Sequence, residues 1–480
     1  MPSLFPRPAV RRPAVVLEPG HRWAVLLPMA LMLASDYKLR SRPVDETVGG
    51  SPDLTVFLEI AVYGLAALYL YFRFGMRPPA RRTTGLLFAT WAFAGYVAMS
   101  ALWSPFMSLG VVRGVQLLIT MALVQVLATR ATLADLHRLA HAFVVVVLVS
   151  VAIGVAHPFP RTPQTRTRFN WLYVHPVIAG VYLGVAVLLV FGLLVRSRRQ
   201  GERARGWPPL VYAGVLLVLM GALVATGTRG AAAGAAAGLL VLMATARGPR
   251  GRIDLVVIGG AVGAVGVLAF SDKIMNFVAR GESADKLASL NSRTDLWSLA
   301  MRAYEEKPIF GHGLGASRGL FLQDIGLGGG HNAFVNALVD NGTVGTALFV
   351  VLLLTLGTVL VTLVRRRELR GDAGTLLGIL AFFLVDGITT EGLAVPANVS
   401  GIWLLLLVAW TETLRRGRFR PDGPRVAITI PGAVSAPDAA LDTTSDAARD
   451  AASVPGPARD AASVPHAPPA AQVEPAPHRP

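Results

Sequence analysis

Long apolar runs separated by short polar segments dominate the chain. Each run can cross a hydrocarbon core of about 30 Å as a helix, once tilt and flanking residues are allowed for. We therefore predict twelve transmembrane helices, with the ranges Trp23–Ser35, Leu54–Tyr71, Thr84–Trp103, Phe106–Ala128, Leu139–Ala156, Val177–Val195, Leu210–Thr226, Gly230–Ala246, Leu255–Phe270, Val344–Val364, Thr375–Thr390 and Gly401–Thr411.

Arginines are concentrated in every second connection between these helices. Beyond the basic N-terminal segment, the clusters are Arg73–Arg82, Arg130–Arg138, Arg196–Arg205, Arg247–Arg252, Arg365–Arg370 and Arg415–Arg425. Positively charged flanks stay on the cytoplasmic side of bacterial membranes. We expect both termini to be cytoplasmic and the other connections to lie outside.

One predicted outer segment, residues 271–343, is much longer than the others. It contains aromatic and apolar residues at helical spacing, so we expect an ordered helical module. The predicted organisation is a cytoplasmic segment 1–22, transmembrane helices over 23–270, this external module, transmembrane helices over 344–414, and a tail over 415–480 that is first basic and then Pro/Ala-rich and disordered.

Composition supports the membrane assignment. Hydrophobic residues make up 53% of the chain and charged residues only 15%, which is too little polar surface for a soluble domain of this size. Much of the net charge of +16 serves topology and contact with anionic membrane lipids, so nucleic acid is not an expected partner. The chain has no cysteine, which excludes disulfides and cysteine nucleophiles.

A helix is predicted at the end of the long module, capped by Asn291 or Ser292 and ended by Pro308. Arg293 lies in its first turn, where the helix dipole disfavours a positive side chain. A bound anion would remove that penalty. A solvated surface arginine is the alternative.

Two glycine-rich segments follow. The bend Pro308–Gly315 has glycines that allow close approach of backbone to backbone or ligand, but it lacks the strand and the Lys-Ser/Thr of a phosphate loop. After a second glycine run, His331 is predicted to begin a helix that Gly342 ends. The dipole there favours neutral imidazole, which suits a general base, although a lone histidine is often structural.

Arg229 lies in a predicted outer turn between two spans rich in small and aliphatic residues. It can either reach lipid phosphates at the membrane surface or coordinate a substrate phosphate. Glu59, Arg113 and Asp386 are ionisable residues inside predicted spans, where such groups usually pair or line a polar cavity.

These motifs resemble the O-antigen ligase and polymerase superfamily. The resemblance is carried by Thr228-Arg229-Gly230, by Arg293 and Trp297, by the Pro308–Gly315 bend, by His331-Asn332, and by Asp340 with Gly342 and Gly345; His175-Pro176 and Leu102-Trp103-Ser104-Pro105 are weaker matches.

The resemblance implies an all-α membrane glycosyltransferase of GT-C type in the bacterial cytoplasmic membrane, with its active site outside. It would take a glycan from an undecaprenyl diphosphate carrier, transfer it to a glycan or lipid acceptor, and need no cofactor. His331, Arg293 and Arg229 would be catalytic, the two arginines holding the diphosphate. Asn332, Trp297, Arg168 and His175 would contribute to substrate binding.

The residues agree with this chemistry, because arginines can stabilise a leaving diphosphate and no outward Asp-x-Asp pair or His/Glu metal spacing is present. We therefore expect a metal-independent enzyme of the ligase type. A polymerase that joins lipid-linked repeat units is the alternative. A transporter is a further alternative, but it would predict internal repeats, and the two halves show none.

Overall fold

The computed structural model describes residues 21–37, 53–75, 84–157, 168–172, 174–200, 207–246, 293–325 and 329–418. All of them belong to one compact unit, Met1–Pro421. The predicted ninth span, Leu255–Phe270, and the tail beyond residue 418 lie outside the described residues.

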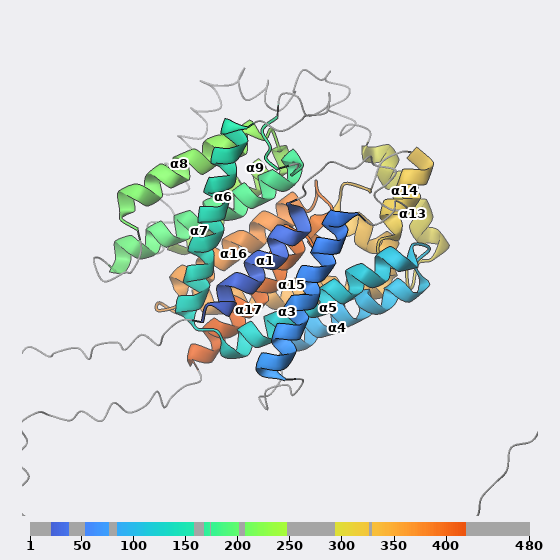
Figure 1. Ribbon diagram of the computed structural model, residues 1–480, viewed down its shortest axis with the longest axis horizontal. Coiled ribbons are helices and arrows are strands. Elements are labelled where there is room, and N and C mark those ends of the chain that lie inside the picture. The colour runs from blue at the N-terminus through green and yellow to red at the C-terminus, as the bar shows by residue number, and fades with distance from the viewer. Residues whose placement is uncertain are drawn as a thin grey trace, which may run out of the picture. The chain divides into compact units, whose positions relative to one another are not determined.

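Helices form nearly all of the regular structure in these ranges (Figure 1). They are α1 Trp23–Asp36, α3 Leu54–Phe74, α4 Gly85–Ser100, η1 Ala101–Trp103, α5 Met107–Arg130, α6 Leu133–Ala156, α7 Pro176–Gln200, α8 Pro209–Ala225, α9 Arg229–Ala246, α13 Arg293–Glu306, α14 Ala316–Ile325, α15 Ala333–Val364, α16 Arg370–Asp386, η4 Gly392–Ala394 and α17 Val399–Arg418.

The chain is an all-α polytopic membrane protein, as predicted. Seven of the described helices are long and apolar enough to cross a membrane, and α1 and α8 are shorter apolar helices. Every predicted span except the ninth overlaps a described helix. Large apolar side chains such as Leu210 and Phe72 are 84% and 79% exposed, which suits a surface that faces lipid.

The helix ends that we predicted to lie outside meet one another. Asp36, at the end of α1, accepts a hydrogen bond from the backbone N–H of Val399 at the start of α17 (2.7 Å). The N–H of Phe169 donates to Ala225 O at the end of α8 (2.9 Å), and Ala333 N–H donates to Gly387 O (2.8 Å). We call this the site end of the bundle.

The arginine-bearing helix ends meet at the other end. Arg416 of α17 donates to the carbonyl oxygens of Thr129 and Ala131, where α5 gives way to α6. His21 contacts Asp135 in the first turn of α6.

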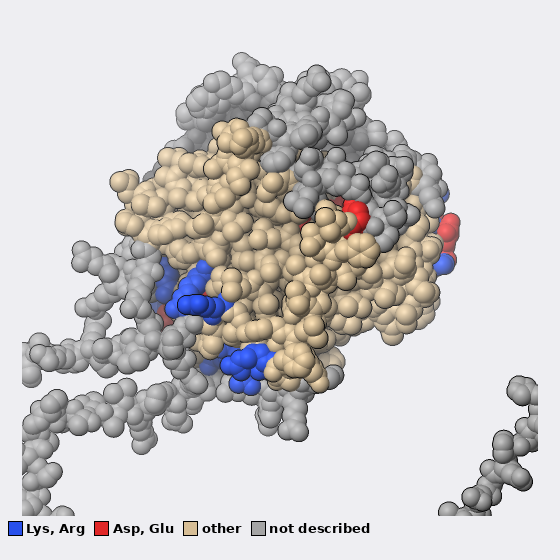
Figure 2. Space-filling view, viewed as in Figure 1, with Lys and Arg blue, Asp and Glu red and all other residues tan. Residues whose placement is uncertain are grey.

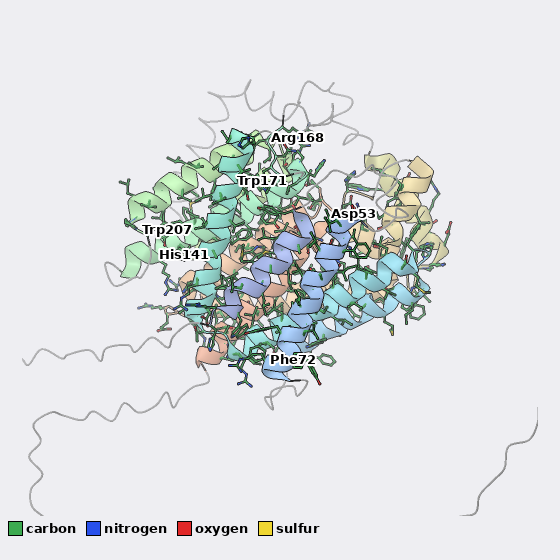
Figure 3. The ribbon with its side chains drawn as sticks, in the orientation of Figure 1. Asp53, Phe72, His141, Arg168, Trp171 and Trp207 are labelled. Carbon is green, nitrogen blue, oxygen red and sulfur yellow. The ribbon has the colours of Figure 1, made fainter. Side chains whose placement is uncertain are left out.

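Figure 3 places Arg168, Trp171 and Asp53 toward the site end and Trp207, His141 and Phe72 toward the other. Figure 2 shows Lys and Arg side chains grouped toward the lower left, near the end of α17. The sequence thus predicted which helix ends share a side.

Helices α9 and α16 pack unusually closely because small residues line their contact. A Cβ atom added to Gly234 would lie 2.8 Å from Phe382 O, and one added to Gly238 would lie 2.6 Å from Gly378 O. Gly230, one turn earlier, faces Thr389 in the same way. This small-xxx-small spacing lets two backbones approach within the membrane. It also fixes the position of Arg229, the first residue of α9.

Candidate functional site

His331 lies just before α15 rather than within it. Asn332 is the N-cap, and its side-chain oxygen accepts hydrogen bonds from Phe334 and Val335 N–H (2.9 and 3.2 Å). His331 has φ +47°, a left-handed conformation that only a loop residue can adopt here. The prediction that His331 begins the helix was therefore wrong by two residues, because asparagine is the better N-cap. The imidazole still stands beside the positive end of α15.

Glu391, from the segment between α16 and α17, is the acidic partner of His331. Its Oε1 lies 3.3 Å from His331 Nδ1, and the two side chains are 27% and 44% exposed. Glu391 Oε2 accepts a hydrogen bond from Asn336 Nδ2 (3.3 Å), and Asn336 Oδ1 accepts one from Gly330 N–H (3.0 Å). Asn336 of α15, the helix that follows the histidine, thus holds the carboxylate of Glu391 in place.

Burial has a strong effect on this carboxyl group. Desolvation raises the pKa of Glu391 to about 7, with a further contribution from Asp340, while Arg318 and Asn336 act in the opposite direction. A carboxyl group that titrates near neutral pH beside an imidazole is typical of acid–base sites. Sequence reasoning missed Glu391. Its position directly after the predicted span Thr375–Thr390 was the available signal, because it put an acidic residue at the outer helix ends.

The glycine-rich bend packs against α15, as its glycines predicted. Gly311 has φ +71°, and a Cβ there would lie 2.5 Å from Asp340 O. Gly342 has φ +61° and breaks the helical geometry of α15, so the chain kinks there and continues directly into the next helical segment. The predicted stop at Gly342 is therefore a kink. Together, these glycines let the bend dock where α15 changes direction.

Asp340 is used structurally at this junction. Its side chain is buried, and its Oδ1 accepts a hydrogen bond from Ser317 N–H (2.6 Å) in the first turn of α14. A carboxylate at this place satisfies the free N–H groups and the dipole of the helix. Asp340 is also part of the motif that resembles the O-antigen ligases, but this arrangement favours a role in fixing α14 over a role as a base.

Arg168 and Arg229 come together at the turn between α8 and α9. Arg168 donates from Nε to Thr226 O (2.8 Å) and from Nη2 to Thr228 Oγ1 (3.1 Å). Desolvation and then the positive charge of Arg229 lower the pKa of Arg168. Two positive charges that affect each other at one turn create an environment that favours an anion.

His175 lies beside this arginine pair, immediately before α7. Its Nδ1 accepts a hydrogen bond from Val177 N–H (3.3 Å), so its proton belongs on Nε2. Water reaches the ring, yet the surrounding protein limits its hydration. Desolvation, followed by the charges of Arg168 and His331, lowers the pKa of His175 to about 4. His175 is therefore neutral at pH 7, and it is affected by the charges of both Arg168 and His331.

Helix α13 forms where the sequence predicted it, beginning at Arg293. Only the backbone of Arg293 is described, so its contact with a diphosphate stays a prediction. Trp297 donates from Nε1 to Gly330 O (3.1 Å), directly before His331. This bond ties α13 to the histidine loop. Direct contact of Trp297 or Asn332 with substrate also stays a prediction.

The other ionisable residues have mainly structural surroundings. Arg113 of α5 contacts both Glu59 of α3 and Gln116. Asp386 accepts a hydrogen bond from Thr390 Oγ1 (2.8 Å). Among the described residues, no group of three or more His, Asp or Glu side chains is placed to hold a metal ion.

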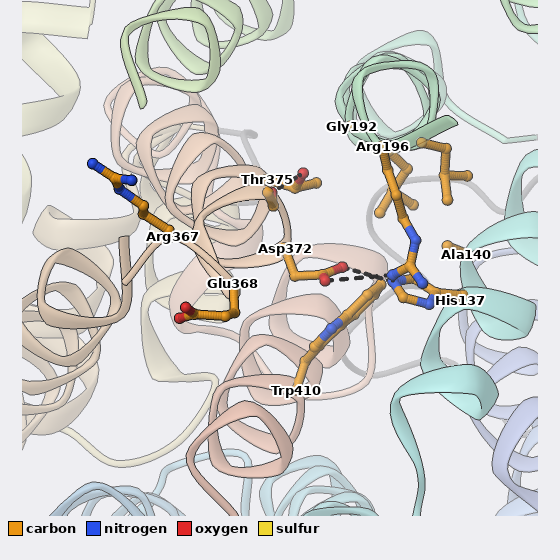
Figure 4. A pocket seen from close by; sticks show the side chains of 12 residues that line it. His137, Ala140, Gly192, Arg196, Arg367, Glu368, Asp372, Thr375 and Trp410 are labelled. Carbon is orange, nitrogen blue, oxygen red and sulfur yellow. Dashed lines mark hydrogen bonds and ion pairs between the residues drawn. The ribbon is translucent and has the colours of Figure 1, made fainter. Parts of the chain in front are cut away.

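A cavity of about 200 Å³ lies at the arginine-bearing end, and its lining does not include His331 (Figure 4). His137, Arg196 and Asp372 contact one another along its wall, and Trp410 covers one side. These contacts join α6, α7 and α16. Because His137, Arg196 and Asp372 are already paired with one another, we assign this cluster a structural role in holding the three helices together.

Comparison with known proteins identifies the region that carries the site. The family model described as O-antigen ligase matches residues 213–350. This range includes most of α8, all of α9, α13 and α14, and the first part of α15. It therefore contains Arg229, Arg293 and His331. No curated protein matches the chain. The match covers the part of the chain that holds the motifs from Arg229 to Gly345, and it supports their resemblance to the O-antigen ligase superfamily.

Proposed function

We propose that the protein transfers a glycan from an undecaprenyl diphosphate carrier to a glycan or lipid acceptor on the outer face of the bacterial cytoplasmic membrane. The observation that carries the proposal is that the segment following α16 contacts both regions: Thr389 faces Gly230, next to Arg229, and Gly387 O accepts a hydrogen bond from Ala333 N–H, two residues after His331. Cations suited to a diphosphate and a base suited to a hydroxyl are then available in one site.

The reaction is a displacement at the anomeric carbon of the donor sugar. The acceptor oxygen forms the new glycosidic bond, the bond to the diphosphate breaks, and its electron pair leaves with the diphosphate. His331 Nε2 accepts the proton of the acceptor hydroxyl, while Glu391 beside Nδ1 orients the ring and stabilises the imidazolium. Arg168 and Arg229 stabilise the negative charge that develops on the leaving group, with Arg293 as a further predicted contact.

Arginine is well suited to this leaving group. Its planar guanidinium presents several N–H donors in a fixed arrangement that matches phosphate oxygens. The turn at Thr226–Thr228 uses two of the donors of Arg168, which sets its orientation before substrate binds. A preorganised donor does not need to be reoriented as charge develops.

The test is transfer by the purified protein in detergent or liposomes, with an undecaprenyl-diphosphate-linked glycan and separate acceptors. We expect a glycosylated acceptor, free undecaprenyl diphosphate as second product, and undiminished transfer in excess EDTA. Loss of activity in EDTA with recovery on adding magnesium or manganese would contradict the arginine-based mechanism. A deletion strain separates ligase from polymerase, because loss of attachment indicates the former and loss of chain length the latter.

A further inference from the structure

Arg318 is a second cationic feature of the site end, and it is fixed by the packing of α14. Gly319, the next residue, faces the ring of Phe106 so closely that a Cβ there would overlap it. Ser317, the preceding residue, donates its N–H to Asp340 of α15. With neighbours on both sides held in place, the backbone of Arg318 has little freedom to move.

The surroundings of Arg318 compensate its charge only partly, through the carboxylate of Glu391. The side chain is exposed, and among the described residues no hydrogen bond or ion pair involves its guanidinium group. Protein nevertheless surrounds it: desolvation and the charge of Arg113 lower the pKa of Arg318, while the charge of Glu391 opposes them. Arg113 differs, because it is paired with Glu59. Arg318 is therefore a positioned cation that is available to a ligand.

Arg318 belongs to a different part of the site from the Arg168–Arg229 pair. It projects from α14, whereas the pair lies at the turn before α9, and Figure 1 shows α14 and α9 well apart. The positive charge of Arg229 affects Arg168, while that of Arg113 affects Arg318. The His331–Glu391 pair interacts electrostatically with both parts of the site, because the charge of His331 affects His175 and the charge of Glu391 affects Arg318.

We infer that Arg318 binds an anionic group, a phosphate or a carboxylate, carried by the acceptor. The inference rests on the proposed function, in which the Arg168–Arg229 pair holds the leaving diphosphate. In a single displacement, the attacking hydroxyl and the leaving group lie on opposite faces of the anomeric carbon. An anion at Arg318, on α14 and apart from the arginine pair at the start of α9, therefore belongs to the molecule that supplies the hydroxyl.

The experiment compares three synthetic lipid-anchored oligosaccharide acceptors: one with a phosphate monoester, the same compound after phosphatase treatment, and one with a uronic acid carboxylate. Wild type, Arg318→Ala, Arg318→Gln and Arg318→Lys are assayed with a fixed lipid-linked donor. Arg302→Ala is the matched control, because Arg302 is an exposed arginine on neighbouring α13. Monodispersity at matched expression checks folding, and Arg318→Gln keeps most of the side-chain volume.

We expect Arg318→Ala and Arg318→Gln to raise KM for the preferred charged acceptor by about 10- to 100-fold, as for loss of a charged hydrogen bond. KM for the donor and for the neutral acceptor should stay within about twofold, and Arg318→Lys should recover part of the loss. The charged acceptor that shows the larger effect identifies the group as phosphate or carboxylate.

Two outcomes would overturn the inference while leaving the proposed function intact: equal losses with all three acceptors, or a raised KM for the donor. A wild-type protein that transfers nothing from any lipid-linked donor would instead contradict the proposed function itself. In that case Arg318 could not be assigned to an acceptor, and the inference would fall with it.

Discussion

Glu391 Oε1 lies 3.3 Å from Nδ1 of His331, although the two residues belong to segments separated by α15 and α16. This relationship turns a single exposed histidine into an oriented one. With Nδ1 directed at a carboxylate, the tautomer that carries its proton on Nδ1 and its lone pair on Nε2 is favoured. The pair is the feature of the molecule that most directly suggests chemistry.

His331 should be needed for the chemical step. Removing a general base typically lowers the rate by about 10² to 10⁴, so His331→Ala should bind carrier but transfer almost nothing. His331→Gln should be equally inactive, because glutamine preserves hydrogen bonding without useful basicity. Single-turnover transfer measures the step, with His157→Ala at an exposed helix end as control. Wild-type transfer by His331→Gln would mean that the histidine only positions substrate.

The ionisation of Glu391 should produce an acidic limb in the pH–rate profile of the reaction. Its pKa is raised to about 7, so the carboxylate forms only as pH rises through that value. We therefore expect kcat/KM to increase through pH 7 and to fall on acidification. Glu391→Gln should lower kcat/KM and flatten this limb.

A pH–rate profile between about pH 5 and 9 tests the assignment. Glu305→Gln is the control, because Glu305 is an exposed carboxylate in the last turn of α13. An unchanged limb in Glu391→Gln would assign the ionisation to another group.

The arginines should not tolerate lysine. A lysine ammonium retains the charge but cannot reproduce the bidentate contact of a guanidinium with phosphate oxygens. Arg229→Lys and Arg293→Lys should each lower transfer by about tenfold or more, as expected for loss of a charged hydrogen bond. Transfer at matched expression is the measurement, with Arg302→Lys as control. Near-normal turnover in Arg229→Lys would support contact with membrane phosphates instead.

Local patterns predicted the helices well, because a membrane helix needs a continuous apolar run and satisfies its backbone internally. The start of α13 at Arg293 and the close approach at Gly311 followed from capping and glycine rules in the same way. The sequence also contained the signal for Asn332 as the N-cap of α15, since asparagine is among the preferred capping residues.

The composition of the site was only partly predictable. Arg229 and His331 stand out because their immediate neighbours are unusual. Glu391 and Arg318 do not stand out, because their significance depends on contacts between segments that are distant in the sequence. Glu391 precedes η4 and contacts His331, and α14, which carries Arg318, packs against Phe106 at the start of α5. Such pairings are set by tertiary packing, which a single sequence does not reveal.

Topology can be tested independently of activity. The arginine clusters predict that the connection at Arg367 is cytoplasmic and that the exposed segment at Lys307 is external. A reporter active only outside the membrane should be silent when fused at Arg367 and active when inserted at Lys307. The opposite result would reverse the orientation and place the site end in the cytoplasm.

The close packing of α9 against α16 should matter for activity as well as for stability, because it positions Arg229. A methyl group at Gly238 would lie 2.6 Å from Gly378 O, well inside van der Waals contact, so Gly238→Ala must push the two helices apart. The matched control is Gly221→Ala in α8, where a Cβ would have no heavy atom within 4 Å. We expect Gly238→Ala to lower both the thermal unfolding temperature and the transfer rate, and Gly221→Ala to leave both unchanged or to raise stability slightly, since alanine favours helix more than glycine does. If Gly238→Ala lowered the unfolding temperature but transferred at the wild-type rate, Arg229 would not depend on this contact for its position.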